Sequence, residues 1–218
     1  LDPPAFRQLF RNPFLDAQLI ERLFELPAVL QSYEARREAV GHLRTPRLLS
    51  LRFVGGLYWV DLVRVGLDNR LHPVVRRAAD LRLIERLPSL AVGEKIAIAR
   101  SADAAVLAVL RNDPTPRVIA ALLENPRLAE GLLVPLLASE SALPAVLAVI
   151  AGSPKWSVRY PIRLALCQNP RTPLDRALML LPMLKRGDLE SVAANLRLKL
   201  PLRRRAQLLA RGGGELRI

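Results

Sequence analysis

Proline recurs along this chain at the borders of short apolar segments, and this feature restricts the fold more than any other. At several borders the proline follows a residue whose side-chain oxygen can accept from the free N–H groups of a helix start. Proline suits the first helical position, because the N–H that it lacks would have no partner there. We therefore expect many short helices beginning at such dipeptides. The dipeptides assigned to helix starts are Asn12-Pro13, Thr45-Pro46, Asp113-Pro114, Asn125-Pro126, Ser153-Pro154, Asn169-Pro170 and Thr172-Pro173.

The segments between these prolines carry apolar side chains at helical spacing, as at Leu128, Leu132 and Leu136. No segment alternates apolar and polar residues for long, and neither Asn-Gly nor Asp-Gly, the common hairpin turns, occurs in the chain. Aromatic residues make up only 5%, whereas Leu, Ala, Val and Arg dominate, which favours helices over a β-sandwich. The sequence predicts an all-α protein of about ten to twelve short helices.

Composition excludes several classes of protein. With 51% hydrophobic residues in 218, the chain can bury a sizeable core and is not disordered. A lone cysteine, Cys167, forms no internal disulfide, and with two histidines the chain lacks the ligands of a common structural zinc site. We expect a buried, unreactive Cys167, a structural His72 at a helix start, and no cofactor.

Neither the N-terminus nor the apolar stretches of the chain suggest secretion or a membrane span. The longest apolar stretch, residues 142–152, is shorter than the roughly 18 residues that a spanning helix needs. The N-terminus shows no secretory leader. Of 33 basic residues only Lys95, Lys155, Lys185 and Lys199 are lysine, a bias typical of GC-rich genomes. We expect a soluble protein of the bacterial cytoplasm, without a membrane span.

A short pattern recurs in the second half of the chain. Residues 121–126 (Ala-Leu-Leu-Glu-Asn-Pro) match residues 165–170 (Ala-Leu-Cys-Gln-Asn-Pro) at a separation of 44 positions. A step of about 40–47 residues that holds two or more helices is typical of HEAT and armadillo repeats. Each helix pair carries too much apolar surface to be stable alone, so neighbouring pairs would stack into one core.

Two segments resemble a named family. Residues 72–80, His-Pro-Val-Val-Arg-Arg-Ala-Ala-Asp, resemble the Pro-x-Val-Arg-x-x-Ala core of HEAT repeats, and residues 201–206 are a looser copy. The proline restarts are also similar to those of bacterial leucine-rich repeat variants. The resemblance implies an α-solenoid of HEAT-like helical repeats, wound as a right-handed superhelix. We expect one domain over residues 1–218, HEAT-like over 70–210, weakly repeat-like over 1–60, with a tail at 211–218.

Positive charge is concentrated near the C-terminus. The chain has a formal net charge of +13, of which residues 155–218 carry +10. Such a segment attracts polyanions, although an Arg-rich surface in a GC-rich organism has the same composition. We expect a helix from Ser153 in which basic side chains form one row and two aromatic rings form the next, kinked at Pro161. The candidate polyanion-binding residues are Lys155, Trp156, Arg159, Tyr160, Arg163, Arg203, Arg204 and Arg205.

Three functions remain open on the sequence alone. Solenoids offer a concave surface, so the leading hypothesis is a non-enzymatic scaffold that binds a protein partner. The alternative is a nucleic-acid-binding protein that uses the basic segment through phosphate contacts and base stacking. Trp59, Asp61 and Trp156 also give a distant resemblance to HEAT-like alkylpurine DNA glycosylases, which implies a damaged nucleotide held between aromatic rings and an aspartate. No other catalytic residues are predicted, and homo-oligomerisation is left open.

Overall fold

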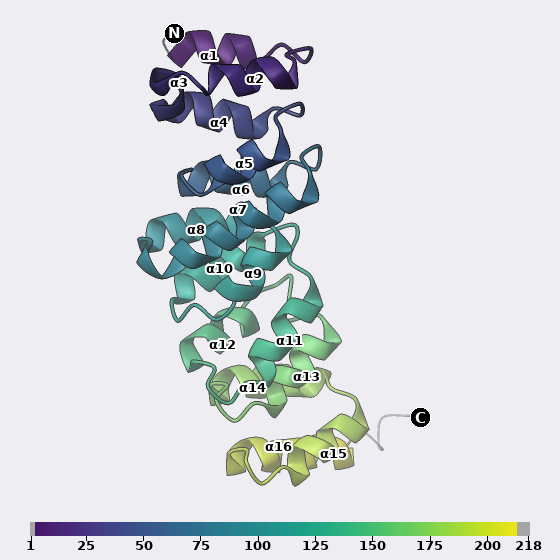
Figure 1. The fold of residues 1–218 in the computed structure, drawn as a ribbon. Helices are drawn as coiled ribbons and strands as arrows, with labels where there is room; N and C mark the ends of the chain where they lie inside the picture. Colours follow the sequence, from purple (N-terminus) through teal and green to yellow (C-terminus); the bar gives the residue numbers. More distant parts are fainter. Residues whose placement is uncertain (1–2, 213–218) are drawn as a thin grey trace. The chain divides into compact units, whose positions relative to one another are not determined.

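A computed structural model describes residues 3–212, and within this range the protein is entirely helical (Figure 1). The described chain forms 16 α-helices and two 3-10 helices and contains no strand, so the all-α prediction is confirmed and the expected helix number was too low. The helices are α1 (Pro3–Phe10), α2 (Ala17–Leu23), α3 (Pro27–Gln31), α4 (Tyr33–Gly41), α5 (Arg47–Val54), α6 (Trp59–Leu67), α7 (Pro73–Arg86), η1 (Leu87–Ser89), α8 (Val92–Ser101), α9 (Ala104–Leu110), α10 (Pro116–Glu124), α11 (Glu130–Ala138), α12 (Pro144–Ala151), α13 (Tyr160–Gln168), α14 (Leu174–Leu180), η2 (Leu181–Met183), α15 (Arg186–Ala194) and α16 (Leu200–Gly212).

Proline delimits these helices, but not always as predicted. His72 caps α7 as expected: its ring Nδ1 accepts from the Val74 N–H at 3.2 Å, and proline follows at the first helical position. Asn125 and Asn169, in contrast, end α10 and α13 instead of starting the next helix. Each asparagine side chain accepts from the N–H two residues further on, at 2.8 Å, and so forms an Asx turn. The N-cap assignment of these two Asn-Pro pairs was therefore wrong, and so was that of the other five pairs.

Asn12 and Asp113 likewise accept from the N–H two residues further on. Thr45 and Thr172 precede a proline that is itself the N-cap, and turns follow Ser153.

The chain divides into two compact units, Leu1–Val106 and Leu107–Ile218. In the first unit α1 contacts α4, α4 contacts α5 and α6, α5 and α6 both contact α7, and α6 contacts α8. The buried side chains of this unit include Ile20, Leu57 and Leu62. The first unit thus has a core of its own.

The second unit is built from two rows of alternating helices. Helix α10 contacts α12, α12 contacts α14, and α14 contacts α16, whereas α11, α13 and α15 contact one another in the same succession. Contacts between α12 and α13, between α13 and α14 and between α15 and α16 join the two rows. Leu122, Leu147 and Leu166 are completely buried in this unit. The apolar faces of the short helices therefore meet between the rows.

Helix positions in the first unit recur in the second at a separation of 127 residues. Helices α4, α5, α6 and α7 begin at residues 33, 47, 59 and 73, and α13, α14, α15 and α16 begin at residues 160, 174, 186 and 200. Helices α1 and α2 correspond in the same way to α11 and α12. We call residues 3–86 the first copy and residues 130–212 the second copy. The 44-residue match between the two Asn-Pro pairs instead spans three helices, α11 to α13.

Long-range hydrogen bonds recur at the same separation. The Tyr33 hydroxyl donates to the Asp61 carboxylate at 2.5 Å and accepts from the N–H of Tyr58 at 3.0 Å. The hydroxyl of Tyr160 likewise donates to the Asp188 carboxylate and accepts from the N–H of Lys185, at 3.0 Å. Each tyrosine precedes its partners by the same 28 and 25 positions. Agreement at side-chain level indicates that the two copies share one internal architecture.

A second shared contact links the ends of two helices in each copy. A ring nitrogen of His42 lies 3.1 Å from the carbonyl oxygen of Asn12. At the corresponding positions, the side-chain amide of Asn169 donates to the carbonyl of Ser139 at 3.0 Å. Different side chains thus make equivalent bonds, which explains why comparing residue types alone does not detect the correspondence.

Candidate binding surfaces

The predicted basic and aromatic helix does not form. Residues 154–159 are turns, and α13 begins only at Tyr160, with Pro161 as its second residue. Proline is well tolerated at this position, so it neither interrupts nor kinks a helix. Lys155, Arg159 and Arg163 therefore do not form one row along a helix, and that prediction was wrong.

Trp156 is a core residue. Its side chain is completely buried, and its indole N–H donates to the carbonyl of Leu123 at 2.9 Å. The corresponding residue of the first copy, Val29, is buried as well. The Arg159 guanidinium lies 4.5 Å and the Lys155 ammonium 5.2 Å from the indole ring centroid, so cation–π contacts hold both cations against the buried ring. The prediction that Trp156 stacks on bases is wrong.

Tyr160 and Arg163 hold elements together. Burial and the hydrogen bond to Asp188 raise the pKa of the Tyr160 hydroxyl, which therefore remains a donor at neutral pH. The Arg163 guanidinium donates to the carbonyls of Ser157 at 3.3 Å and Val158 at 3.0 Å, and to a third carbonyl near the end of η2. A guanidinium engaged with backbone carbonyls has few donors left for phosphate.

The three arginines of α16 differ in their surroundings. Arg203 is half-buried and donates from Nε to the carbonyl of Ala193 at 3.1 Å. Arg204 and Arg205 are exposed. Of the eight predicted polyanion-binding residues, Lys155 and Arg159 are exposed as well, but both cations lie against the Trp156 ring.

A cleft of about 450 Å³ lies between α15 and α16, and the sequence analysis did not predict it. Each helix contributes residues at positions i, i+4, i+7 and i+8, which share one helix face. Three alanines line it, whereas three arginines, a glutamate and a glutamine supply its polar groups. The lining residues are Arg186, Glu190, Ala193, Ala194, Arg203, Gln207, Ala210 and Arg211. This periodicity is visible in the sequence once the two helix boundaries are known.

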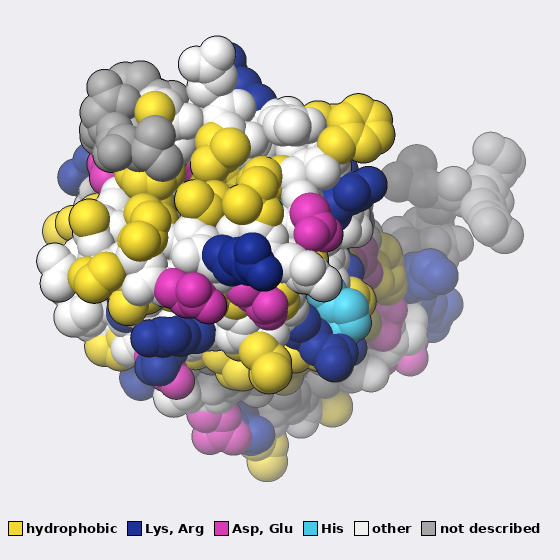
Figure 2. Space-filling view, turned by 45° about the horizontal axis from the view of Figure 1, so that its top comes forward, with side chains coloured by type: hydrophobic (Ala, Val, Ile, Leu, Met, Phe, Trp, Pro, Cys, Tyr) yellow, Lys and Arg dark blue, Asp and Glu magenta, His cyan; other side chains and the backbone are white. Residues whose placement is uncertain are grey.

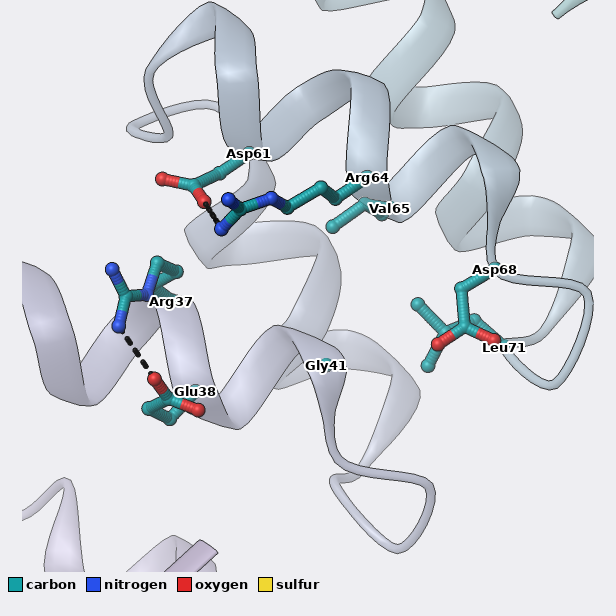
Figure 3. A pocket seen from close by; sticks show the side chains of 8 residues that line it. All are labelled: Arg37, Glu38, Gly41, Asp61, Arg64, Val65, Asp68 and Leu71. Carbon is teal, nitrogen blue, oxygen red and sulfur yellow. Dashed lines mark hydrogen bonds and ion pairs between the residues drawn. The ribbon is translucent and has the colours of Figure 1, made fainter. Parts of the chain in front are cut away.

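A smaller pocket, of about 190 Å³, lies between α4 and α6 of the first unit (Figure 3). Its charges are paired: Arg37 contacts Glu38 at 2.6 Å, and Arg64 contacts Asp61 at 3.3 Å. Figure 3 shows both pairs near one end of the pocket and Asp68 at the other. The Arg70 side chain hydrogen-bonds to Asp68 and lowers the pKa of that carboxyl. This compensation of charge does not select for a ligand of either sign.

The residues behind the glycosylase resemblance are engaged within their own units. The Trp59 indole N–H donates to Glu94 at 2.9 Å. Asp61 is buried and accepts from Tyr33 and from Arg64. Burial and the bond to Asp61 raise the pKa of the Tyr33 hydroxyl to about 12. These contacts stabilise helix starts, and the buried Trp156 offers no ring face to a nucleotide.

Cys167 is buried as expected, and burial raises the pKa of its thiol to about 12. Such a thiol remains protonated at neutral pH and is a weak nucleophile. Within residues 3–212, no group of three or more His, Cys, Asp or Glu side chains is placed to hold a metal ion. No helix in that range is long and apolar enough to cross a membrane.

Charges of both signs are mixed on the surface that Figure 2 shows. Lys and Arg side chains lie beside Asp and Glu side chains there, with hydrophobic groups between them. A histidine is visible on this surface, and both histidines of the chain, His42 and His72, belong to the first unit. This face of the first unit therefore lacks the single-sign field that attracts polyanions.

Comparison of the chain with protein-family models, with curated proteins and with solved structures finds no match.

Proposed function

We propose that this protein is a non-enzymatic binding module, an α-solenoid of short helical repeats whose partner is another protein. The observation that carries the proposal is the open cleft of about 450 Å³ between α15 and α16. In the second unit, alternating helices contact one another in two rows. Solenoids stack helices in this way and present the faces of one row to their partners. A HEAT-like superhelix is the form of this arrangement that we propose.

Nucleic acid is the second candidate partner, favoured by the exposed Arg204 and Arg205 and by the charge of +10 over residues 155–218. We rank it below protein because Arg163 and Arg203 donate to backbone carbonyls and Trp156 is buried. Binding through phosphates would depend steeply on salt concentration, whereas binding through apolar contacts with the alanines of the cleft would depend on it less.

One experiment separates the two. A photo-reactive amino acid at Gln207, in the cleft, is irradiated in lysate of the source organism, before and after nuclease treatment, at about 50 and about 200 mM salt. We expect the same discrete protein adduct at both salt concentrations. The control carries the photo-reactive group at Arg205, also on α16 but outside the cleft lining. Adducts with nucleic acid alone, before nuclease treatment and only at low salt, would contradict the protein hypothesis.

A further inference from the structure

The pocket between α4 and α6 of the first unit is lined by charged side chains, most of which are little exposed. Arg37, Glu38 and Asp68 expose 22%, 27% and 22% of their side chains, and Asp61 is buried. Partly buried charges attract the charges of a ligand more strongly than exposed ones do, because less water screens them. These side chains are therefore better placed for recognition than charges on an open surface.

The packing of the helices does not require most of these charges. In the second copy α13 contacts α15 as α4 contacts α6 in the first, and the bridge from tyrosine to aspartate is kept. The other four charged residues of the pocket do not recur: Arg37, Glu38, Arg64 and Asp68 correspond to Leu164, Ala165, Ser191 and Asn195. Equivalent helices thus pack without the four charges, which points to a role for them outside packing.

The charges are distributed over two ends of the pocket (Figure 3). Arg37 and Arg64 lie near Asp61 at one end, whereas Asp68 supplies the single charge of the lining at the other. Asp61 and Asp68 are seven residues apart along α6, which separates the two ends by about 10 Å. Val65, between them on α6, adds apolar surface. A ligand that reaches both ends is therefore elongated.

Both ends keep capacity for further hydrogen bonds. Arg64 donates to Asp61 from Nη1 at 3.3 Å, and Arg37 donates to Glu38 from Nη2 at 2.6 Å. A guanidinium carries five N–H donors, so each arginine can also donate to a carboxylate of a ligand. The Asp68 carboxylate accepts three hydrogen bonds from Arg70, at 2.7–3.0 Å, and has room for about one more donor.

We propose that the α4–α6 pocket binds a small linear zwitterion of the ω-amino acid kind. Arg64 and Arg37 hold its carboxylate, Asp68 holds its ammonium group, and its methylene groups contact Val65. A ligand without net charge suits the pocket, because the five charged residues of the lining, together with Arg70, have a formal charge of zero. The inference goes beyond the proposed function, since it concerns another ligand and another unit of the chain.

The test titrates the whole chain with ε-aminocaproate, whose two charges stand at opposite ends of a methylene chain. Caproate and hexylamine each keep one of these charges, and glycine carries both charges close together. Shifts of the backbone amide signals in NMR spectra give the affinities. We expect ε-aminocaproate to bind with a Kd of about 1 mM or tighter, and at least about tenfold more tightly than each comparison compound.

Two glycine substitutions locate the site. Gly41 lines the pocket on the same face of α4 as Arg37, and a Cβ atom at Gly41 meets nothing within 4 Å. Gly41→Phe therefore places a ring in the pocket without a clash, and we expect it to weaken binding of ε-aminocaproate at least about tenfold. Gly93→Phe, at an equally open position of α8 outside the lining, should change the affinity less than about twofold.

Asp68→Asn tests recognition of the ammonium group. It introduces the residue of the second copy, Asn195, which accepts from the N–H of Arg197 at 3.1 Å as Asp68 accepts from the N–H of Arg70 at 3.0 Å. The turn is thus kept while the negative charge is lost. We expect affinity for ε-aminocaproate to fall at least about fivefold and affinity for caproate not to fall. Circular dichroism confirms that all variants fold.

Three outcomes would overturn the inference. Equal affinity for caproate or hexylamine would show that one charge is enough for binding. Unchanged affinity in Gly41→Phe would place the ligand elsewhere on the chain. Absence of amide shifts up to about 10 mM ε-aminocaproate would mean that the paired charges only stabilise the contact between α4 and α6. None of these outcomes affects the protein adduct at Gln207 that tests the proposed function, so the two hypotheses fail separately.

Discussion

Asp80 and Gly66 fit together where α6 and α7 cross in the first unit. A Cβ atom on Gly66 would lie 2.5 Å from the Asp80 Oδ1, closer than any real contact allows. Burial, and then the negative charge of Asp103, raise the pKa of Asp80 to about 6, whereas Arg76 acts in the opposite direction. The fold thus prefers this carboxyl in its neutral form.

The first prediction concerns Asp80 and pH. Because the folded state raises the pKa of Asp80 above its unfolded value of about 3.9, this group destabilises the fold progressively as pH rises from about 4 to 6. Asp80→Asn removes the ionisable group and with it this loss of unfolding free energy at higher pH. We expect the free energy of unfolding of the variant, relative to wild type, to increase by about 1–3 kcal/mol between pH 4 and pH 7 in urea titrations. A difference that stays constant with pH would contradict this assignment.

The second prediction concerns Gly66. Gly66→Ala forces its Cβ against the Asp80 carboxylate, and we expect a loss of about 1–3 kcal/mol in unfolding free energy by urea denaturation. Gly93→Ala is the matched control, because a Cβ at Gly93 in α8 meets nothing within 4 Å. The control is expected to be neutral or to gain up to about 1 kcal/mol through helix propensity. If Asp80→Ser restores stability to Gly66→Ala, the clash is with this carboxylate.

At the scale of the element, a tyrosine from another helix completes the N-termini of α6 and α15. Neither Tyr58 nor Lys185, the cap residues, caps its helix with its own side chain. Instead the hydroxyls of Tyr33 and Tyr160 accept from the cap N–H groups and donate to the aspartates at the third helical positions. This arrangement resembles a capping box with a tyrosine hydroxyl inserted, and it joins α4 to α6 and α13 to α15.

The third prediction concerns this hydroxyl. Tyr33→Phe leaves the buried Asp61 without one donor and the Tyr58 N–H without an acceptor, so we expect a loss of about 1–3 kcal/mol in unfolding free energy. Tyr58→Phe removes the same atom from an exposed ring that lies against Tyr33, and should cost less than about 0.5 kcal/mol. Urea denaturation of both variants measures the difference. Similar losses would mean that the Tyr33 hydroxyl contributes no more than the exposed Tyr58 hydroxyl, which would contradict the capping role.

The sequence predicted the all-α class and the helix start at His72, but not the caps at the seven proline dipeptides. His72 was identified as a helix start because its cap involves only its immediate neighbours. Asn125 was misassigned because an asparagine before proline suits an Asx turn as well as a cap. Trp156 was misassigned because its partner, the carbonyl of Leu123, is 33 positions away and no local pattern reveals it. The α15–α16 cleft needed both helix boundaries, which periodicity alone did not define.

At the scale of the whole molecule, the division into two compact units has a consequence for stability. Trp156 and Leu123 both belong to the second unit, and their bond is completely buried. The fourth prediction is that Trp156→Ala, which opens a large cavity there, speeds hydrogen exchange of α10 and α13 far more than that of α4 and α5. Hydrogen-exchange mass spectrometry measures this peptide by peptide. Equal acceleration in both units would show that they open as one cooperative body.

Because helix positions recur after 127 residues, corresponding segments of the two copies can be exchanged. Because residues 33–85 and 160–212 place equivalent helices at equivalent positions, one segment could be transplanted into the place of the other without changing any loop length. Such chimeras would carry the tyrosine bridge intact, since its three residues move together. In such chimeras the exposed side chains would change, whereas the interior contacts between the helices would be kept.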